Sequence, residues 1–259
     1  MKIIRFQSKD EISYGLVDGE KVYTYAETPF DLTFSGNFKL SGQSISTADI
    51  RLLPPCQPSK IVCLGLNYRP HSDELKMKLP DLPLLFIKPS TAVIGPDDNI
   101  VLPPGSARID YECELGVVIG KTARNVKESE FAEYVLGYSC FNDVTDRIAQ
   151  SHDGQWTRSK SHDTFAPLGP CIDTMVEPFN LKIETRLNGK VMQSDYTSNL
   201  IFPVPYLVSF ISHCMTLLPG DVIATGTPAG IGPLNAGDIV EVIIEKIGTL
   251  RNHVVASSK

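Results

Sequence analysis

Short runs of β-forming residues recur along this chain from Lys60 onward, and they constrain its fold more than any other feature. Each run is rich in aliphatic and aromatic residues and is bounded by turn-forming residues, the pattern of a strand between turns. The runs are KIVCLGL, PLLFIK, ELGVVIG, VLGYSCF, LKIETRL, DVIATG and DIVEVIIE. They do not alternate regularly with helical patterns, as a Rossmann fold or a TIM barrel requires. We therefore expect an α+β, β-rich fold.

Only two segments carry convincing helix signals. The first begins at Asn125, where Glu128 three residues later would complete a capping box ahead of ESEFAEYV. The second extends from about residue 203 to 216, with prolines in its first turn and Pro219-Gly220 after its end. An Asn-Gly pair at 188–189 predicts a hairpin between LKIETRL and KVMQSD.

The first 55 residues predict a small β domain of their own. Ile3–Phe6 and Tyr14–Val17 have the composition of short strands, and Asp18-Gly19 predicts a tight turn into KVYTY. The proline-rich segment LLPPCQPSK follows and is the best candidate for a domain boundary. We expect a small N-terminal β domain over 1–55 and a larger domain over 56–259.

Composition excludes several classes of partner. The formal net charge is −6 and no basic run or stripe is present, which argues against nucleic acid and against an anionic membrane surface. The six cysteines form no CxxC pair and are typical of reduced core residues. The N-terminus MKIIRFQSKDE turns polar too early for a signal peptide, and IFPVPYLVSFISHCMTLL is too short for a membrane span. We expect a cytoplasmic protein.

The stretch IDYECELGVVIG places two glutamates two residues apart at the start of an apolar run. In a strand, Glu112 and Glu114 would share one face, which could be the solvent face of an antiparallel strand. Asp143 follows another apolar run, where it could close the strand through an Asx turn. Alternatively, all three carboxylates converge on a cation, since like charges in a semi-buried place need compensation. An all-oxygen site of this kind suits Mg²⁺, Mn²⁺ or Ca²⁺ and argues against zinc.

Three long or glycine- and proline-rich connections are candidates for function: 67–83, 145–165 and 225–232. In the first, one turn of helix would place His71 and Glu74 on the same face, and a carboxylate that orients an imidazole forms a general base. An exposed histidine on a polar loop is the simpler alternative.

The second connection carries Lys160 between Arg158 and His162, in QWTRSKSHDTFAPLGP. This could be a solvated basic patch, but the surrounding apolar residues suggest a lysine tucked in toward an anionic substrate group. The third connection, TGTPAGIG, allows backbone amides to approach a ligand closely. It lacks the GK[ST] of a P-loop, which disfavours nucleotide binding.

The order of these segments resembles the fumarylacetoacetate hydrolase family. The resemblance covers about residues 58 to 255, and its motifs are specific in combination. They are NYxxHxxE, FIKPST, DYExEL, NDVT, QWTRSKSHDTFAPLGP, LNGKVMQSDYTSNLIFPVPYLVSFIS, TLLPGDVIATGTPAGIGP and GDIVEVIIEKIGTLRN. It implies a mixed β-sandwich roll with a short N-terminal domain, a homodimer, and a Mg²⁺ or Mn²⁺ site. The metal carboxylates of the family fall on Glu112, Glu114 and Asp143 of this sequence.

The resemblance also implies catalytic groups. The family's histidine and glutamate, on a lid loop, fall on His71 and Glu74, and its active-site lysine falls on Lys160. A glutamine seven residues past the metal aspartate matches Gln150, and the threonine of the TGTP loop matches Thr227.

Two departures from the family pattern lie close to these positions. Many members read NDVSARD or NDVTARD, whereas this chain reads NDVTDRI, with Asp146 and Ile148 at the changed positions. Many also have SFDTF after the lysine, where His162 here replaces the aromatic residue. Both changes bear on the identity of the substrate and not on the metal.

We expect hydrolysis of a C–C bond in a small 2,4-dioxo acid, an acylpyruvate. The metal and Lys160 would stabilise the developing pyruvate enolate, and His71, oriented by Glu74, would deprotonate the attacking water. The same enolate chemistry would serve an oxo-acid decarboxylase, or an isomerase and decarboxylase of unsaturated dicarboxylates. A dicarboxylate would need a second cation, for which Arg69 and Arg147 are candidates, and Tyr68 beside Arg69 is a further substrate-binding candidate. A non-catalytic ligand-binding protein is the remaining alternative, which the presence of all these groups disfavours.

Overall fold

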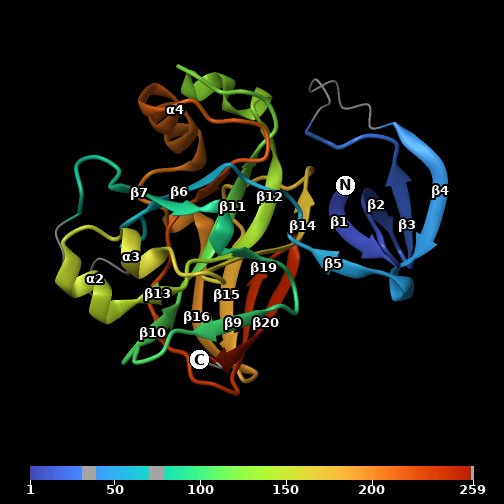
Figure 1. Cartoon of the computed structure of the whole chain (residues 1–259). Helices are drawn as coiled ribbons and strands as arrows, with labels where there is room; N and C mark the ends of the chain where they lie inside the picture. Colours follow the sequence, from blue (N-terminus) through green and yellow to red (C-terminus); the bar gives the residue numbers. More distant parts are fainter. Residues whose placement is uncertain (31–38, 70–78, 258–259) are drawn as a thin grey trace.

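The computed structural model describes residues 1–30, 39–69 and 79–257, and the strands in these ranges form three sheets (Figure 1). The largest has the order β4-β3-β2-β1-β14-β12-β11-β17-β6-β7, with β5 paired to β1 and β8 paired to β14. A second sheet has the order β16-β15-β19-β20-β9, and a small third one has the order β13-β10-β18. With few helices beside them, these sheets confirm the α+β, β-rich prediction.

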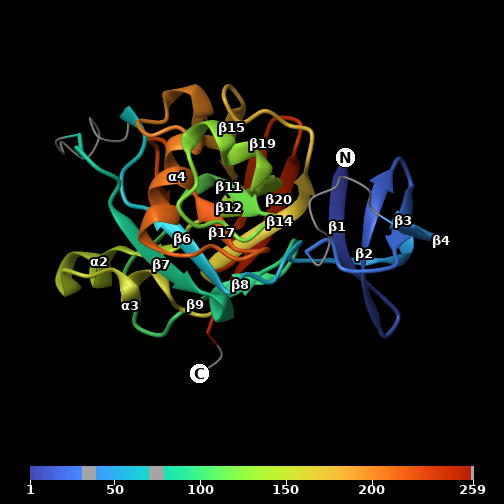
Figure 2. The same cartoon turned by 90° about the horizontal axis from the view of Figure 1, so that it is seen from above.

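The N-terminal residues form an antiparallel unit at one side of the molecule, drawn in blue in Figures 1 and 2. Its strands are β1 (Lys2–Ser8), β2 (Glu11–Asp18), β3 (Lys21–Tyr25), β4 (Leu40–Ser46) and β5 (Arg51–Leu53), with a 3-10 turn at Thr47–Asp49. The turn at Asp18-Gly19 joins β2 to β3 as predicted, with Asp18 opposite Lys21. At its start β1 also pairs with β14, so a continuous sheet crosses the expected boundary. The division into 1–55 and 56–259 stays a prediction.

The part of the largest sheet beyond the N-terminal unit is mostly buried, except for its last strand β7 and the short β8. Its strands are β6 (Lys60–Leu64), β7 (Leu85–Pro89), β11 (Cys113–Ile119), β12 (Val135–Asn142), β14 (Ala166–Asp173) and β17 (Val222–Ala224), with the short β8 (Val93–Ile94) at β14 after a 3-10 turn at Ser90–Ala92. Every residue of β11 and β12 is buried, which agrees with the continuous apolar runs in these segments. The two strands pair antiparallel, and β17 pairs antiparallel with β11 on its other side.

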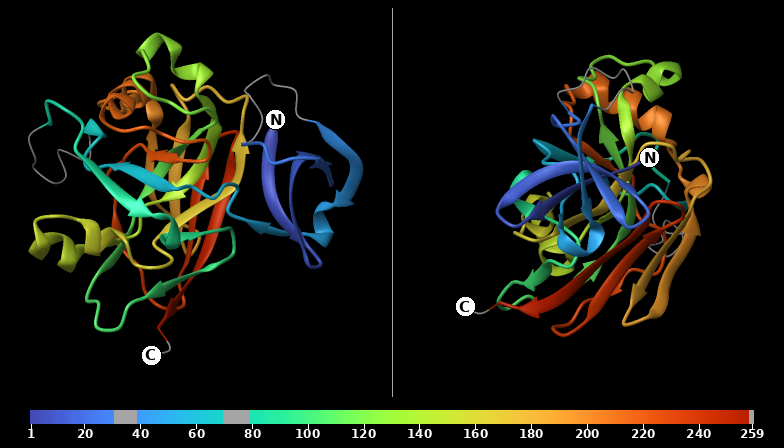
Figure 3. Two further views of the ribbon diagram at one scale, coloured as in Figure 1. Left: turned by 45° about the horizontal axis from the view of Figure 1, so that its top comes forward. Right: turned by 90° about the vertical axis from the view of Figure 1, so that its right-hand side faces the viewer.

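The second sheet packs against the first. Its strands are β9 (Asn99–Leu102), β15 (Lys182–Leu187), β16 (Lys190–Tyr196), β19 (Ile239–Ile244) and β20 (Gly248–Ala256), and Figure 3 shows the orange-to-red strands of this sheet along one side of the molecule. Leu115 and Val117 of β11 share one apolar cluster with Ile183 of β15 and Val242 of β19, so the main core lies between the sheets. The Asn188-Gly189 hairpin is confirmed, and both residues have positive φ, at 52° and 78°.

The third sheet lies at the entrance to β11. It consists of β10 (Ile109–Tyr111), β13 (Thr145–Asp146) and β18 (Gly232–Pro233). Because β10 ends at Tyr111 and β11 begins at Cys113, Glu112 lies at the junction of two sheets.

The helices differ partly from the prediction. The helix expected over 203–216 is confirmed as α4 (Val204–Cys214). The helix expected from Asn125 is wrong: a 3-10 helix spans Glu128–Glu133, and no side chain caps its start. Asn125 has a φ of 52°, whereas a capping residue needs extended backbone, so the capping box cannot form.

Two short helices lie in the connection 145–165, where the sequence pattern predicts no helix. They are α2 (Arg147–Asp153) and α3 (Thr157–Lys160), and a 3-10 turn at Thr197–Asn199 precedes α4. The Asp146 carboxylate caps α2 by accepting from the backbone N–H groups of Ile148 and Ala149, both at 3.0 Å. No helix among the described residues is both long enough and apolar enough to cross a lipid bilayer.

A buried carboxylate ties together the starts of the parallel strands β6 and β17. Asp221 is fully buried and precedes β17 directly. It accepts from the backbone N–H groups of Ser59, Lys60 and Leu218, from the Ser59 hydroxyl, and from the Lys60 ammonium at 2.5 Å. The parallel strands β6 and β17 thus both begin at the same buried carboxylate.

Replacing this anchor, in Asp221→Ala, is expected to lower the free energy of unfolding by about 3 to 5 kcal/mol, because buried donors and the Lys60 charge lose their partner. Urea unfolding followed by circular dichroism measures this. The control is Asp97→Asn, whose carboxylate is 58% exposed and pairs with Arg251 at 2.8 Å. Its effect should be about 1 kcal/mol or less. Equal losses in the two variants would contradict the anchoring role.

Candidate metal centre

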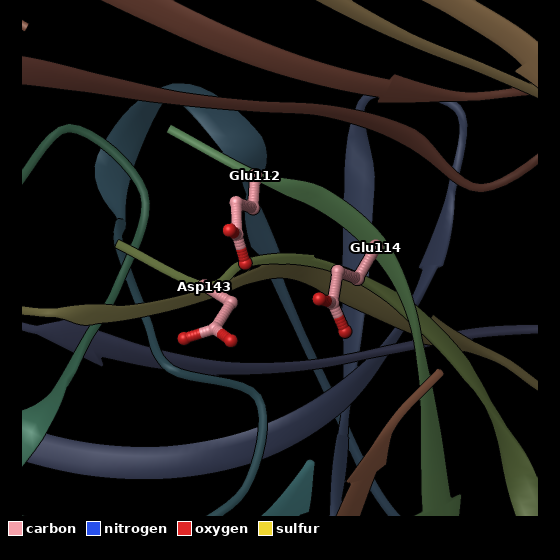
Figure 4. A group of neighbouring side chains, drawn as sticks. All are labelled: Glu112, Glu114 and Asp143. Atoms are coloured by element: carbon pink, nitrogen blue, oxygen red, sulfur yellow. The ribbon is translucent and has the colours of Figure 1, made fainter. Parts of the chain in front are cut away.

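Three carboxylates converge where β11 begins and β12 ends (Figure 4). Glu114 lies in β11, and Asp143 directly follows β12. Because Cys113 pairs with Asn142, the Glu112 carbonyl accepts from the Asp143 N–H at 2.9 Å. One oxygen from each of the three side chains lies within 4.8 Å of the other two, and all three residues are buried. The solvent-face alternative for the two glutamates is therefore excluded.

Two buried lysines neutralise part of this cluster. The Lys160 ammonium donates to Glu112 at 2.9 Å and to Asp143 at 2.6 Å. The Lys88 ammonium donates to the other oxygen of Asp143 at 2.5 Å and to the Val144 carbonyl at 3.0 Å. The Lys160 ammonium also lies 4.8 Å from the centre of the Phe86 ring. The expectation that Lys160 is tucked in is thus met, and it faces the acidic cluster.

The pKa values of the two lysines shift in opposite directions, because burial and neighbouring charges contribute differently to each. Burial lowers the pKa of Lys160, but the carboxylates of Asp143 and Glu112 outweigh it, so its pKa is raised overall. For Lys88, burial outweighs the Asp143 charge and Lys160 adds repulsion, so its pKa is lowered. Lys160 is therefore the more firmly charged of the two.

Arg147 extends the network away from the lysines. Its guanidinium donates to Glu112, to Asp110 at 2.9 Å and to the Gln150 side chain at 2.9 Å. Asp110 is fully buried and also accepts from Arg108 at 2.9 Å. Arg147 and Gln150 thus lie beside the carboxylates and contact each other, while their roles toward a substrate stay predictions.

Glu114 differs from the other two carboxylates. Its Oε2 accepts from the Gly226 N–H at 2.7 Å, while its buried Oε1 has no hydrogen-bond partner among the described residues. Burial raises its pKa well above the ordinary value, and the charges of Asp143 and Glu112 raise it further. No ion pair to Glu114 occurs in the described part of the chain, so an oxygen-preferring divalent cation fits here. The buried acidic triad can hold such an ion.

The TGTP loop follows β17 and lies against the start of β11. Gln193 of β16 donates to the Thr227 hydroxyl at 2.9 Å and to the Pro228 carbonyl at 2.7 Å. The same side chain accepts from the Cys113 N–H at 3.1 Å, so it links this loop to the strand that carries Glu114. Thr227 is thereby fixed within the network, and its contact with a substrate stays a prediction.

The remaining predicted residues lie on the segment after β6. His71 and Glu74 are outside the described residues. Tyr68 is fully buried, and its hydroxyl has no hydrogen-bond partner in the described ranges, while Arg69 is exposed. The backbone of Tyr68 forms a bridge with Leu200. The roles of these four residues stay predictions.

Of the departures from the family pattern, Asp146 has a local structural role. Asp146 caps α2, as described above, and Ile148 is 45% exposed on that helix. The His162 ring lies 4.9 Å from the ring of Phe165, and burial lowers its pKa. None of the three hydrogen-bonds to the acidic triad in the described part of the chain.

Sequence reasoning missed three residues of this network: Lys88, Gln193, and Asn67, whose amide donates to the Thr225 carbonyl of the TGTP loop at 2.7 Å. Lys88 carried a readable signal, because a single lysine ends the apolar run PLLFIK and is fully buried. Asn67 and Gln193 lie within the motifs NYxxHxxE and LNGKVMQSDYTSNLIFPVPYLVSFIS, but neither motif indicates which backbone groups a lone amide would contact. Both are fully or almost fully buried and act through hydrogen bonds to distant segments.

The comparisons with known proteins agree with this geometry. The family model for the fumarylacetoacetate (FAA) hydrolase C-terminal region matches residues 60–255, and the Rv2993c-like, N-terminal model matches residues 1–55. The chain belongs to the fumarylacetoacetate hydrolase family. It is an enzyme of that family, whose exact reaction is taken up below.

Three similar proteins illustrate the range of the family. An uncharacterized protein of Archaeoglobus fulgidus is 57% identical over 86% of this chain and 92% of its own length. Oxaloacetate tautomerase Fahd2a, mitochondrial, of Rattus norvegicus is 41% identical over 79% of this chain and 69% of its own length. The crystal structure of 2-hydroxyhepta-2,4-diene-1,7-dioate isomerase from Mycobacterium marinum is 42% identical, covers 100% of both chains and has a TM-score of 0.92.

In the metal-free protein, Glu114→Gln is expected to raise the free energy of unfolding at pH 7. The pKa of Glu114 is higher in the folded than in the unfolded state, so the folded protein loses stability as the pH rises between the two values. A neutral amide removes this loss. The gain should be present at pH 7 and vanish below the ordinary value of 4.5. Urea unfolding with a chelator at several pH values measures it.

Glu184→Gln is the control, for which the opposite change in stability is expected. Although burial raises the pKa of Glu184, hydrogen bonds from Arg186 and Lys182 outweigh it and lower the pKa overall. This variant should therefore lose stability at neutral pH. If Glu114→Gln instead lowered the free energy of unfolding at pH 7, the charged Glu114 carboxylate would not destabilise the metal-free fold.

Proposed function

We propose that this enzyme hydrolyses a C–C bond in a small 2,4-dioxo acid, an acylpyruvate. The observation that carries the proposal is the buried triad of Glu112, Glu114 and Asp143 with the Lys160 ammonium in direct contact with two of its members. Such a site offers a place for a hard cation beside a fixed positive charge. These are the requirements for holding an oxo acid and for stabilising its enolate.

The three carboxylates would hold Mg²⁺, with Mn²⁺ or Ca²⁺ as alternatives. A divalent ion bound there would act as a Lewis acid that polarises the oxo-acid group. The protein's own part is to keep these carboxylates ionised and aligned. Lys88 and Lys160 hold both oxygens of Asp143, while Arg147 and Lys160 hold those of Glu112.

Lys160 would stabilise the negative charge that develops when the C–C bond breaks. Its ammonium is almost fully buried and firmly charged, so its field is little screened by water. The bonding electrons pass to the pyruvate fragment as an enolate, which then takes up a proton. Thr227, Tyr68, Arg69 and Arg147 are proposed to bind the substrate around this charge, and Gln150 is proposed as a further catalytic residue.

We assign the general base to His71, oriented by Glu74, on the basis of their spacing and of the family motif. The imidazole would take a proton from the water that attacks the distal carbonyl. The fragment released from that side leaves as a carboxylic acid. We also propose a homodimer in the cytoplasm, as the family resemblance implies.

A second candidate is isomerisation or tautomerisation of an oxo acid or an unsaturated dicarboxylate. The names of two relatives favour it: an oxaloacetate tautomerase at 41% identity and a 2-hydroxyhepta-2,4-diene-1,7-dioate isomerase at 42% identity. These reactions use the same enolate but require no attacking water. The two candidates therefore differ in their need for a base that activates water.

A substrate panel with His71→Ala separates the candidates. With Mg²⁺ present, the wild-type protein should hydrolyse acetylpyruvate to pyruvate and acetate, and the variant should lose about 10²- to 10⁴-fold in rate. Product analysis by NMR measures this, with oxaloacetate and an unsaturated heptadioate as the other substrates. Tautomerisation of oxaloacetate without hydrolysis of any dioxo acid would replace the first candidate by the second.

Lys160→Met tests the stabilising charge. Its rate with the best substrate at saturating Mg²⁺ should fall by about 10²- to 10³-fold, as for loss of one group that stabilises a developing anion. The matched control is Lys182→Met, which removes a lysine 47% exposed and paired with Glu184 at 3.0 Å on the second sheet. Its rate should stay at the wild-type level. A Lys160→Met protein that is folded and as fast as the control would remove Lys160 from the mechanism.

A further inference from the structure

We propose that Asn67 is a positioning residue for the metal centre. Its side-chain amide fixes the peptide plane between Thr225 and Gly226, and this plane orients Glu114. The inference deepens the proposed function and rests on the metal site formed by Glu112, Glu114 and Asp143. Neither the sequence motif nor the family comparisons assign a role to this side chain.

The Asn67 amide is fully buried, and its orientation is determined by its partners. Its Nδ2 donates to the Thr225 carbonyl at 2.7 Å and to the Phe202 carbonyl at 3.1 Å. Its Oδ1 accepts from the Phe202 N–H at 2.7 Å. Exchanging oxygen and nitrogen would set the oxygen against two carbonyls, so only this orientation satisfies the three contacts.

The two ends of one peptide unit connect Asn67 to Glu114. Asn67 donates to the Thr225 carbonyl, and the Gly226 N–H donates to Glu114 Oε2 at 2.7 Å. This carbonyl and this N–H belong to the same planar peptide group. Fixing the carbonyl direction therefore fixes the N–H direction. Donation to the carbonyl also polarises the unit and strengthens its N–H as a donor.

Glycine at 226 allows the loop to approach Asn67 closely, but its backbone freedom also means that a hydrogen bond must hold the peptide plane. Gly226 has a φ of +96°, and a Cβ atom there would lie 2.8 Å from Cβ of Asn67. Only glycine permits this close approach at low cost. The same freedom would let the peptide plane rotate if no partner held its carbonyl.

The orientation of this peptide plane determines where Oε1 of Glu114 lies. With Oε2 held by Gly226, Oε1 is buried without a partner among the described residues, and the side chain belongs to the cluster of Glu112 and Asp143. If the peptide plane rotated, Glu114 would face a carbonyl oxygen or lose its donor. Its carboxylate would then no longer be pre-oriented toward the ion.

Binding of Mn²⁺ to the full-length, chelator-treated protein tests the proposal without relying on activity. Calorimetry or the electron paramagnetic resonance signal of free Mn²⁺ measures the dissociation constant. Asn67→Ala should weaken binding by about 10- to 100-fold, the usual effect of removing a group that orients a metal ligand. Asn67→Ser, which retains one hydroxyl donor, should lie between this variant and the wild type and serves if the alanine variant does not fold.

Asn252→Ala is the matched control. Asn252 is 1% exposed, and its Nδ2 likewise donates to two backbone carbonyls, those of Gly95 at 2.8 Å and Asp98 at 3.0 Å. It should lower the unfolding midpoint as Asn67→Ala does but leave Mn²⁺ affinity within about twofold of the wild type, because no metal ligand depends on it.

The outcomes separate the positioning role from the metal site itself. Loss of stability in Asn67→Ala and Asn67→Ser with unchanged Mn²⁺ affinity would overturn the positioning role and leave the site intact. A wild-type protein that binds no Mn²⁺, or whose affinity Glu114→Gln does not alter, would overturn the metal site and the inference that rests on it.

Discussion

Compensation of buried negative charge at the junction of β11 and β12 is the constraint on which the rest of the structure depends. Three carboxylates within reach of one another in a water-poor interior repel strongly, so each needs a donor or a cation. Lys160 and Lys88 meet this need for Asp143, and Lys160 also meets it for Glu112. Among the described residues, Glu114 receives only the Gly226 N–H. The imbalance identifies the place where a metal ion would complete the site.

The sheet brings these groups together because four of its strand ends meet at one edge. β11 begins there and β12 ends there, since the two pair antiparallel. β17 runs antiparallel to β11 and parallel to β6, so these two strands end at the same edge. The TGTP loop follows the end of β17 directly, and Asn67 lies three residues past the end of β6. The site is thus built where the fully buried strands β11 and β12 meet.

Pattern and turn chemistry predicted the local elements well where local forces dominate. The strands at the predicted apolar runs and the turns at 18–19 and 188–189 follow from local composition and from residues that tolerate positive φ. The strands β4, β5, β9 and β20 were not predicted. The helix expected from Asn125 failed because the backbone there adopts a positive φ, which the capping pattern does not reveal. α2 was missed because Asp146 looked like a departure from a motif, whereas it acts as a helix cap.

The sequence by itself determined the type of ligand atom offered at these strand ends, because carboxylate oxygens suit a hard divalent cation whatever their exact geometry. Only the tertiary structure decided which partner each carboxylate receives. Lys88 and Asp143 are 55 residues apart in the chain, and Asn67 and Thr225 are 158 apart. Contacts between such distant residues leave no local pattern, since they depend on strand register and on the packing of whole segments.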